Sequence, residues 1–286
     1  MARWIKTIGK GLAVVFLSAA VIIPQSAAAV PFDFGAKAGW ESFRWKEVDE
    51  NGDRLLEETG PRYTINAFLG NTMRPKSGFI YNVDARLYFG IVDYDGQTQD
   101  GVPAQSDTYY SGFTLEGTSG IRLGPAGGNF NWDVIGKLGY DTWVRDIDDT
   151  VDAIGRRVSG AQESYFVLNL RLGTGPKWQV SRWIGRFIAG LKYPVWTSEY
   201  LDKEDSGLDE NVTLRPKGRL SAFVDFSNRI RLSRKVHLQV DAYYDSYRFD
   251  RSDRESTTMG GVPVLVWQPE SSQDVIGVQV GVGLVF

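Results

Sequence analysis

The sequence predicts an all-β fold, a closed antiparallel transmembrane β-barrel of about ten strands. Three observations carry this prediction. Apolar residues alternate with other residues at a period of two in many segments, the chain begins with the features of an export signal, and no later apolar run approaches the roughly 20 residues of a membrane-spanning helix. An open sheet would leave unpaired N–H and C=O groups in lipid, so the strands are expected to close into a barrel.

The N-terminus has the three parts of a secretory signal peptide. Three basic residues precede an apolar run at 11–23, and small residues follow it up to Ala29. We therefore expect a signal peptide at 1–29 and a barrel domain at 30–286. Removing three positive charges takes the formal net charge from −3 to −6, which argues against general binding to nucleic acid. The chain has no cysteine, so no disulfide is expected.

Ten segments show the alternation, and each is long enough to cross a bilayer at a tilt, which takes roughly 9–11 residues. They are 35–46, 61–70, 77–92, 108–122, 129–145, 160–172, 183–197, 216–228, 235–249 and 273–286. In the last segment every second residue from Ile276 to Phe286 is apolar. This segment resembles the closing strand of bacterial outer-membrane proteins, whose last residue is typically Phe. The resemblance implies a Gram-negative cell envelope and an outer-membrane location.

The connections between these segments alternate in length and charge. The links near 70–77, 122–129, 171–182 and 228–235 are short or basic and contain no acidic residue. The others are longer and hold 25 of the 35 acidic residues; they are 47–60, 93–107, 145–160, 198–215 and 248–274. Short turns of such barrels face the periplasm and long loops face outward, so both termini are expected in the periplasm.

Tryptophans at the strand ends fit the aromatic girdles that mark the two membrane interfaces of such barrels. We expect Trp132 and Trp183 at the inner interface and Trp143 and Trp196 at the outer one.

The positions between the outward residues are expected to line the lumen. The charged or titratable ones are Lys37, Glu41, Asp84, Arg86, Glu116, Asp133, Lys137, Glu163, Arg171, Arg186, Lys192, Arg219, Asp225, His237, Asp241 and Asp245. Acidic and basic positions nearly balance, and a ten-strand barrel is close to the size at which side chains fill the interior. We expect a filled polar lumen; the alternative is a narrow, ion-lined, porin-like channel.

No catalytic or metal centre is recognisable. His237 is the only histidine, and Asp241 on the same strand face is roughly 13 Å away, too far for a dyad. The stretch 49–53 has the opening spacing of a calcium loop, but Arg54 stands where such a loop needs glycine. We therefore expect no enzymatic activity, no cofactor and no metal.

Ten strands with long loops resemble the omptin family of outer-membrane proteases, and residues 192–196, which read Lys-Tyr-Pro-Val-Trp before an acidic loop, are similar to the corresponding stretch there. The resemblance implies an Asp-x-His element at the outer rim, opposite an acidic pair. The loop 198–215 has Asp205, Asp209 and Glu210 but no histidine. The resemblance therefore supports the barrel size and argues against proteolysis.

The last loop contains an apolar run in which Val264, Leu265 and Trp267 are candidates for a surface contact. This run is compatible with a binding tip, a plug that folds back, or a hairpin that extends the wall. We predict a non-enzymatic structural or surface-interaction protein in contact with outer-membrane lipid, lipopolysaccharide and, through its loops, a protein partner. The alternatives are the selective channel and an omptin-like or lipid-acting hydrolase.

Overall fold

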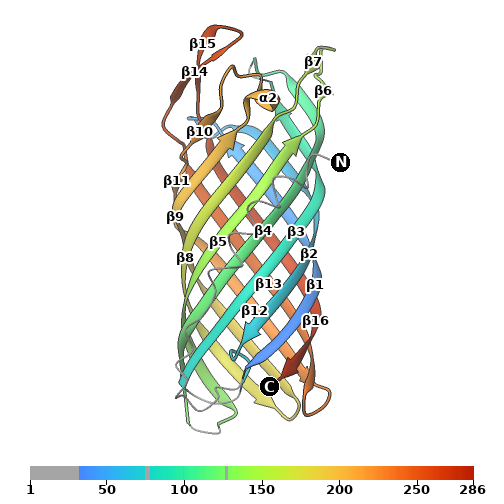
Figure 1. Ribbon diagram of the computed structural model, residues 1–286, viewed down its shortest axis with the longest axis vertical. Coiled ribbons are helices and arrows are strands. Elements are labelled where there is room, and N and C mark those ends of the chain that lie inside the picture. Colours follow the sequence, from blue (N-terminus) through green and yellow to red (C-terminus); the bar gives the residue numbers. More distant parts are fainter. Residues whose placement is uncertain (1–31, 75–77, 99, 126–127) are drawn as a thin grey trace. The chain divides into compact units, whose positions relative to one another are not determined.

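The computed structural model describes residues 32–74, 78–98, 100–125 and 128–286. Residues 32–286 form one compact unit, a closed antiparallel β-barrel, which confirms the predicted fold class (Figure 1). The expected signal peptide, 1–29, lies outside the described residues. In the part of the chain that is described, no helix is both long and apolar enough to cross a membrane.

Ten long strands form the barrel wall, one for each of the ten expected segments. They are β1 (Asp33–Val48), β2 (Arg54–Gly70), β3 (Gly78–Gln97), β4 (Pro103–Leu123), β5 (Phe130–Ile147), β8 (Gln162–Val180), β9 (Trp183–Leu201), β12 (Ser221–Arg231), β13 (Val236–Asp250) and β16 (Glu270–Val285). Each pairs with the next in this series, and β16 pairs with β1 to close the ring. Every wall strand therefore has a partner on both edges, as a spanning sheet requires.

The period of two separates an apolar outside from a mostly polar inside. On β16 the side chains of Val278 and Val280 are 45% and 49% exposed, whereas Gln279 between them is 3% exposed. On β2 the same contrast separates Ile65 from Asn66. The outward apolar residues thus form the belt that a lipid-facing barrel needs.

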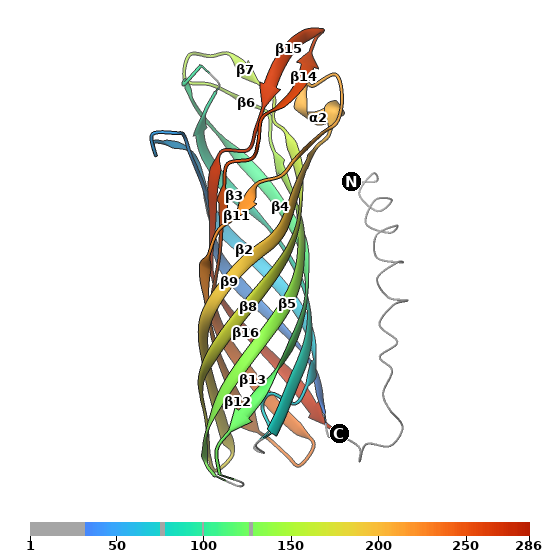
Figure 2. The same cartoon turned by 90° about the vertical axis from the view of Figure 1, so that its left-hand side faces the viewer.

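The barrel has a short-turn end and a long-loop end (Figure 2). The short-turn end holds the connections at 71–77, 124–129, 181–182 and 232–235. There Phe32 and Phe286 also meet, with ring centroids 5.3 Å apart. The long-loop end carries small elements, which are β6 (Thr150–Val151), β7 (Arg157–Val158), α2 (Lys203–Ser206), β10 (Val212–Leu214), β11 (Lys217–Gly218), β14 (Glu255–Met259) and β15 (Val262–Val266).

Strand ends and one bulge differ from the expected strands. Strand β2 begins at Arg54 instead of 61, and β8 continues to Val180 instead of 172, so residues expected in links belong to the wall. In β9, Val195 is a bulge, because Leu168 pairs with Trp196 while Asn169 pairs with Pro194. Proline cannot donate a ladder hydrogen bond, and a bulge reverses which face later residues occupy.

Three of the four tryptophans assigned to the girdles face outward, and the prediction is wrong for Trp143. Trp132, Trp183 and Trp196 are 44%, 38% and 48% exposed on the outside. Trp143 is 2% exposed and lies inside the barrel. The reason is its position: it is two residues from Asp141 on β5, and both therefore face the lumen.

Candidate functional site: a filled lumen

Inward side chains fill the lumen in three successive layers. From the long-loop end these are an acidic cluster, an aromatic layer and an ion-pair layer around a small cavity. The acidic cluster consists of Glu47, Glu58, Arg145, Glu163 and Glu199. The aromatic layer consists of Phe43, Trp45, Tyr88, Tyr110, Trp143, Tyr165, Tyr247 and Phe249, which belong to one packed cluster.

In the acidic cluster, three of the four carboxylates pair with one guanidinium. The Arg145 Nε atom lies 3.0 Å from Glu58, and its Nη1 atom lies 2.7 Å from Glu163 and 3.3 Å from Glu47. Glu199 lies across from Tyr165 in the β8–β9 register and is 1% exposed. Burial of this many charges requires close pairing, so Arg145 is the residue that makes the cluster possible.

A wide vestibule of about 1370 Å³ opens above the acidic cluster, and Glu47, Glu163 and Glu199 contribute to its lining. Its rim includes Trp267, over whose ring the Arg254 guanidinium lies at 5.0 Å from the centroid. The rim therefore combines charged and apolar side chains at the long-loop end.

The apolar run of the last loop forms the β14–β15 hairpin, which stands above the barrel and does not enter the lumen (Figure 1). This excludes the fold-back plug and agrees with a hairpin that extends the wall. Val264 packs against the buried cluster of Leu208, Val212 and Leu214. Leu265 and Trp267 remain 54% and 39% exposed, so two of the three candidate contact residues are available at the surface.

The aromatic layer crosses the whole section of the barrel. Trp45 comes from β1, Trp143 from β5, Tyr165 from β8 and Tyr247 from β13, and none is more than 2% exposed. The rings of Trp143 and Tyr165 stack with centroids 4.8 Å apart. Since these strands lie on different sides of the ring, their side chains meet in the interior below the vestibule.

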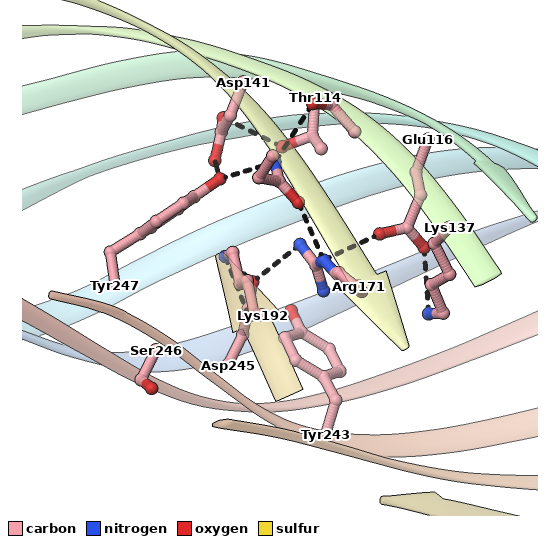
Figure 3. Close-up of polar contacts among 12 residues, drawn as sticks. Thr114, Glu116, Lys137, Asp141, Arg171, Lys192, Tyr243, Asp245, Ser246 and Tyr247 are labelled. Atoms are coloured by element: carbon pink, nitrogen blue, oxygen red, sulfur yellow. Dashed lines mark hydrogen bonds and ion pairs between the residues drawn. The ribbon is translucent and has the colours of Figure 1, made fainter. Parts of the chain in front are cut away.

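The ion-pair layer links strands across the interior (Figure 3). Asp245 on β13 lies 2.9 Å from Lys192 on β9 and 3.1 Å from Arg171 on β8. Arg171 also lies 3.1 Å from Glu116 on β4, which in turn lies 2.9 Å from Lys137 on β5. This chain of charges ties together strands that are not neighbours in the sheet.

A second chain of charges occupies the other side of the lumen. Glu41 accepts hydrogen bonds from Arg62 at 2.7 Å and Arg86 at 3.2 Å, and Lys37 donates to Asp241 at 2.7 Å. A cavity of about 140 Å³ lies between the two chains and has both acidic and basic lining residues.

The structure places fifteen of the sixteen predicted lumen residues on the inner face of the wall. Their exposed side-chain fractions range from 0% for Lys192 to 25% for Asp84 and Asp225. The prediction is wrong for Arg219. This residue precedes the first residue of β12, is about half exposed, and pairs with Asp250 at 3.4 Å outside the lumen.

Several buried charges were missed by the sequence reasoning. Glu58 was missed because β2 begins earlier than expected, whereas Arg62 stands at an inward position of the expected segment 61–70 and was left out of the prediction. Glu199 was missed because it was assigned to the link 198–215, while β9 continues to Leu201 and a bulge turns this residue inward. Lys177 and Arg229 were taken as turn residues, yet they belong to β8 and β12 and are buried.

His237 lies at the short-turn end and is 1% exposed. Its two ring nitrogens have no hydrogen-bond partner among the described residues. The Asp241 carboxylate binds Lys37 and Gln239 instead. Within the described ranges, no group of three or more His, Asp or Glu side chains is arranged to hold a metal ion.

Asp209, in the loop that the sequence analysis compared with the omptin rim, has a structural role. The Asp209 carboxylate accepts hydrogen bonds from the backbone N of Gly260 at 3.0 Å and of Gly261 at 2.8 Å, and these bonds lower the pKa of Asp209. The residue two positions after Asp209 is Asn211 and not a histidine. Its side-chain oxygen accepts a hydrogen bond from the backbone N of Lys203 at 3.0 Å. The carboxylate therefore holds the turn of the β14–β15 hairpin.

The sequence matches no family profile and no curated protein. Among solved structures, the chain is similar to the outer membrane protease OmpT from Escherichia coli, with a TM-score of 0.62 and 10% identity over 90% of this chain and 97% of OmpT. The translocator domain of the autotransporter NalP from Neisseria meningitidis has a TM-score of 0.42 and 15% identity over 100% of this chain and 94% of its own. The likeness to OmpT shows a shared outer-membrane β-barrel fold.

Proposed function

We propose that this chain is a non-enzymatic barrel of a Gram-negative outer membrane that is closed to solutes and acts as a structural or surface-interaction protein. The observation that carries the proposal is the aromatic layer, in which Trp45, Trp143, Tyr165 and Tyr247 fill the section of the barrel. Close-packed aromatic side chains leave no path for water or ions.

The proposed orientation puts the short-turn end in the periplasm and the long-loop end at the cell surface. It is supported by the acidic loops, which would face the divalent cations and phosphates of lipopolysaccharide. The exposed belt that includes Ile65 and Val280 would contact lipid. The vestibule rim, with Leu265 and Trp267, is the surface proposed for a protein partner, since exposed apolar patches with a polar rim are typical of contact sites.

Two observations argue against a hydrolase. The sole histidine, His237, lies at the end opposite to the vestibule, and Asp209 is engaged by the hairpin turn. General-base catalysis needs the base within hydrogen-bond reach of the nucleophile or of an activated water, and the lone histidine does not face the loops.

The test uses the purified, full-length barrel in proteoliposomes. Uptake of sugars and amino acids is expected to equal that of protein-free vesicles, and incubation with peptides and with lipid A should leave both substrates intact. Steady solute uptake would favour the channel instead. Cleavage of either substrate that persists in a His237→Ala variant would reveal a hydrolase with other catalytic residues, and cleavage lost in that variant would make His237 part of its machinery.

A further inference from the structure

A cluster of buried cations lies at the short-turn end of the lumen. We call it the basic cluster; it consists of Arg122, Lys177, Arg186 and Arg229, each within three residues of the end of its strand. Their exposed fractions are 1%, 0%, 6% and 6%. They come from β4, β8, β9 and β12, so different strands bring them to one end of the interior.

Two buried carboxylates partly neutralise the basic cluster. Asp133 lies 2.7 Å from the Nε atom of Arg122 and 2.7 Å from the Nε atom of Arg186. Asp33 lies 2.5 Å from Arg229 and 3.1 Å from Arg74. Each carboxylate therefore already serves two arginines.

The remaining donors of the basic cluster have no partner. Lys177 Nζ, Arg186 Nη2 and Arg229 Nε are buried and make no hydrogen bond to any described residue. The segments 1–31, 75–77 and 126–127, which the structure does not describe, contain no Asp or Glu in the sequence. Arg186 and Arg229 already pair with Asp133 and Asp33, whereas Lys177 has no ion-pair partner among the described residues. A buried ammonium group without a counter-charge is costly, so Lys177 calls for a negatively charged partner.

The strand register brings two of these donors together. Lys177 on β8 lies directly across from Arg186 on β9, and both side chains face inward. Like charges at directly opposed positions of a sheet destabilise it. Arg186 and Arg229 also line the cavity of about 140 Å³, which is several times the roughly 30 Å³ share of one water molecule in the liquid.

We propose that the basic cluster binds a small tetrahedral oxyanion, such as inorganic phosphate, beside the cavity that Arg186 and Arg229 line, with Lys177, Arg186 and Arg229 as its ligands. A guanidinium with a free Nη2 and an ammonium group supply charged donors of the kind that bind phosphate oxygens. The oxyanion would neutralise the opposed pair and join β8 to β9 at the short-turn end. Because the site faces the lumen and lies within three residues of the strand ends, a soluble anion is the ligand that it fits.

Equilibrium dialysis of the purified, full-length barrel against radiolabelled phosphate tests this proposal. The chain should bind one phosphate saturably at constant ionic strength. Lys177→Met should weaken binding at least tenfold, and Lys177→Arg should keep it within a few-fold. Lys235→Met is the matched control, because Lys235 is an exposed lysine at the same end, and this variant should bind as the unaltered chain does.

Denaturant unfolding in chloride buffer gives a second readout. Without phosphate, Lys177→Met should be at least as stable as the unaltered chain, since it removes an unpaired buried charge. Low-millimolar phosphate should then raise the unfolding midpoint of the unaltered chain and of Lys235→Met, but not of Lys177→Met.

Three results would overturn the proposal. They are the absence of saturable binding, equal binding by Lys177→Met, and equal stabilisation of all variants, which is the general effect of a kosmotropic anion.

Discussion

The two halves of the lumen are built by the same alternation of side chains but filled in different ways. Toward the long loops, rings such as Trp45 and Trp143 pack across the section, and three carboxylates pair with Arg145. Toward the short turns, ion pairs surround a cavity, and the four cations of the basic cluster have only two carboxylates, Asp33 and Asp133, among their ion-pair partners. The period of two determines which side chains point inward. The residue type determines whether these side chains pack closely or form ion pairs around a cavity.

The two halves therefore stabilise the barrel in different ways. The aromatic layer supplies close packing, whose loss leaves a void. The ion-pair layer supplies charge contacts between distant strands, whose loss leaves an uncompensated charge. Substitutions in the two halves should therefore fail in different ways, and the contrast can be measured.

The largest effect is expected in the aromatic layer. Trp143→Ala should lower the free energy of unfolding by about 3–5 kcal/mol, because it leaves a large cavity among stacked rings. Trp132→Ala, on the outside of the same strand and 44% exposed, should cost clearly less. Urea unfolding in lipid vesicles measures both variants, and equal costs would contradict the assignment of Trp143 to the interior.

The second-largest effect on stability is expected in the acidic cluster. Arg145→Met should cost about 3 kcal/mol, because Glu58 and Glu163 lose their buried counter-charge. The control is Arg156→Met, which removes an arginine that is about half exposed at the same end and should change stability much less. If the two variants were equally stable in the same unfolding assay, Arg145 would not hold the cluster together.

A smaller effect tests the register of β13. Val240→Arg places a charge on the outward face and should cost about 2–4 kcal/mol near the middle of a bilayer. Gln239→Arg should cost less, since Gln239 faces the lumen and already donates to Asp241 at 2.9 Å. Reversible unfolding in vesicles compares the two, and a more damaging Gln239→Arg would reverse the assigned faces of this strand.

The smallest effect concerns the hairpin above the vestibule. Hydrogen bonds from the backbone of Gly261 and Gly260 lower the pKa of Asp209 below its ordinary value of 3.8. A lowered pKa in the folded state means that the stabilisation is present above that ordinary value and is lost as the pH falls below it. The protection factors of the amides of residues 255–266, which correct hydrogen exchange for its intrinsic pH dependence, should therefore fall in acid, and Asp209→Asn should remove most of that fall. An unchanged dependence in the variant would assign it to another group.

The strands and most of the lumen could be predicted because alternation is a local property of the sequence. The inward direction of Glu41, Lys137 and Asp245 follows from the alternation within their own strands. Trp143 had the same parity as Asp141, but the expected girdle outweighed it. Inward-facing residues of a barrel need not be polar, and the packing partners of Trp143 come from β1, β8 and β13, which no local pattern connects.

Lys177 and Glu199 were beyond the sequence for different reasons. The strand containing Lys177 extends eight residues past its expected end at 172, and its cross-strand partner Arg186 follows only from the register of β8 with β9. The inward direction of Glu199 depends on a one-residue bulge in β9. Pro194 indicates an irregularity in this strand but does not fix the position of the bulge. Strand ends and bulges are set by pairing between segments rather than by either segment alone.

Conductance across a planar lipid bilayer tests the closed lumen most directly. The refolded barrel is inserted at neutral pH, and its current is compared with that of the double variant Trp45→Ala and Trp143→Ala, which removes two buried rings of the aromatic layer. The unaltered chain should give no steps above the bare bilayer, whereas the double variant should show ion flow if it remains folded. Steady conductance of the unaltered chain would contradict the account.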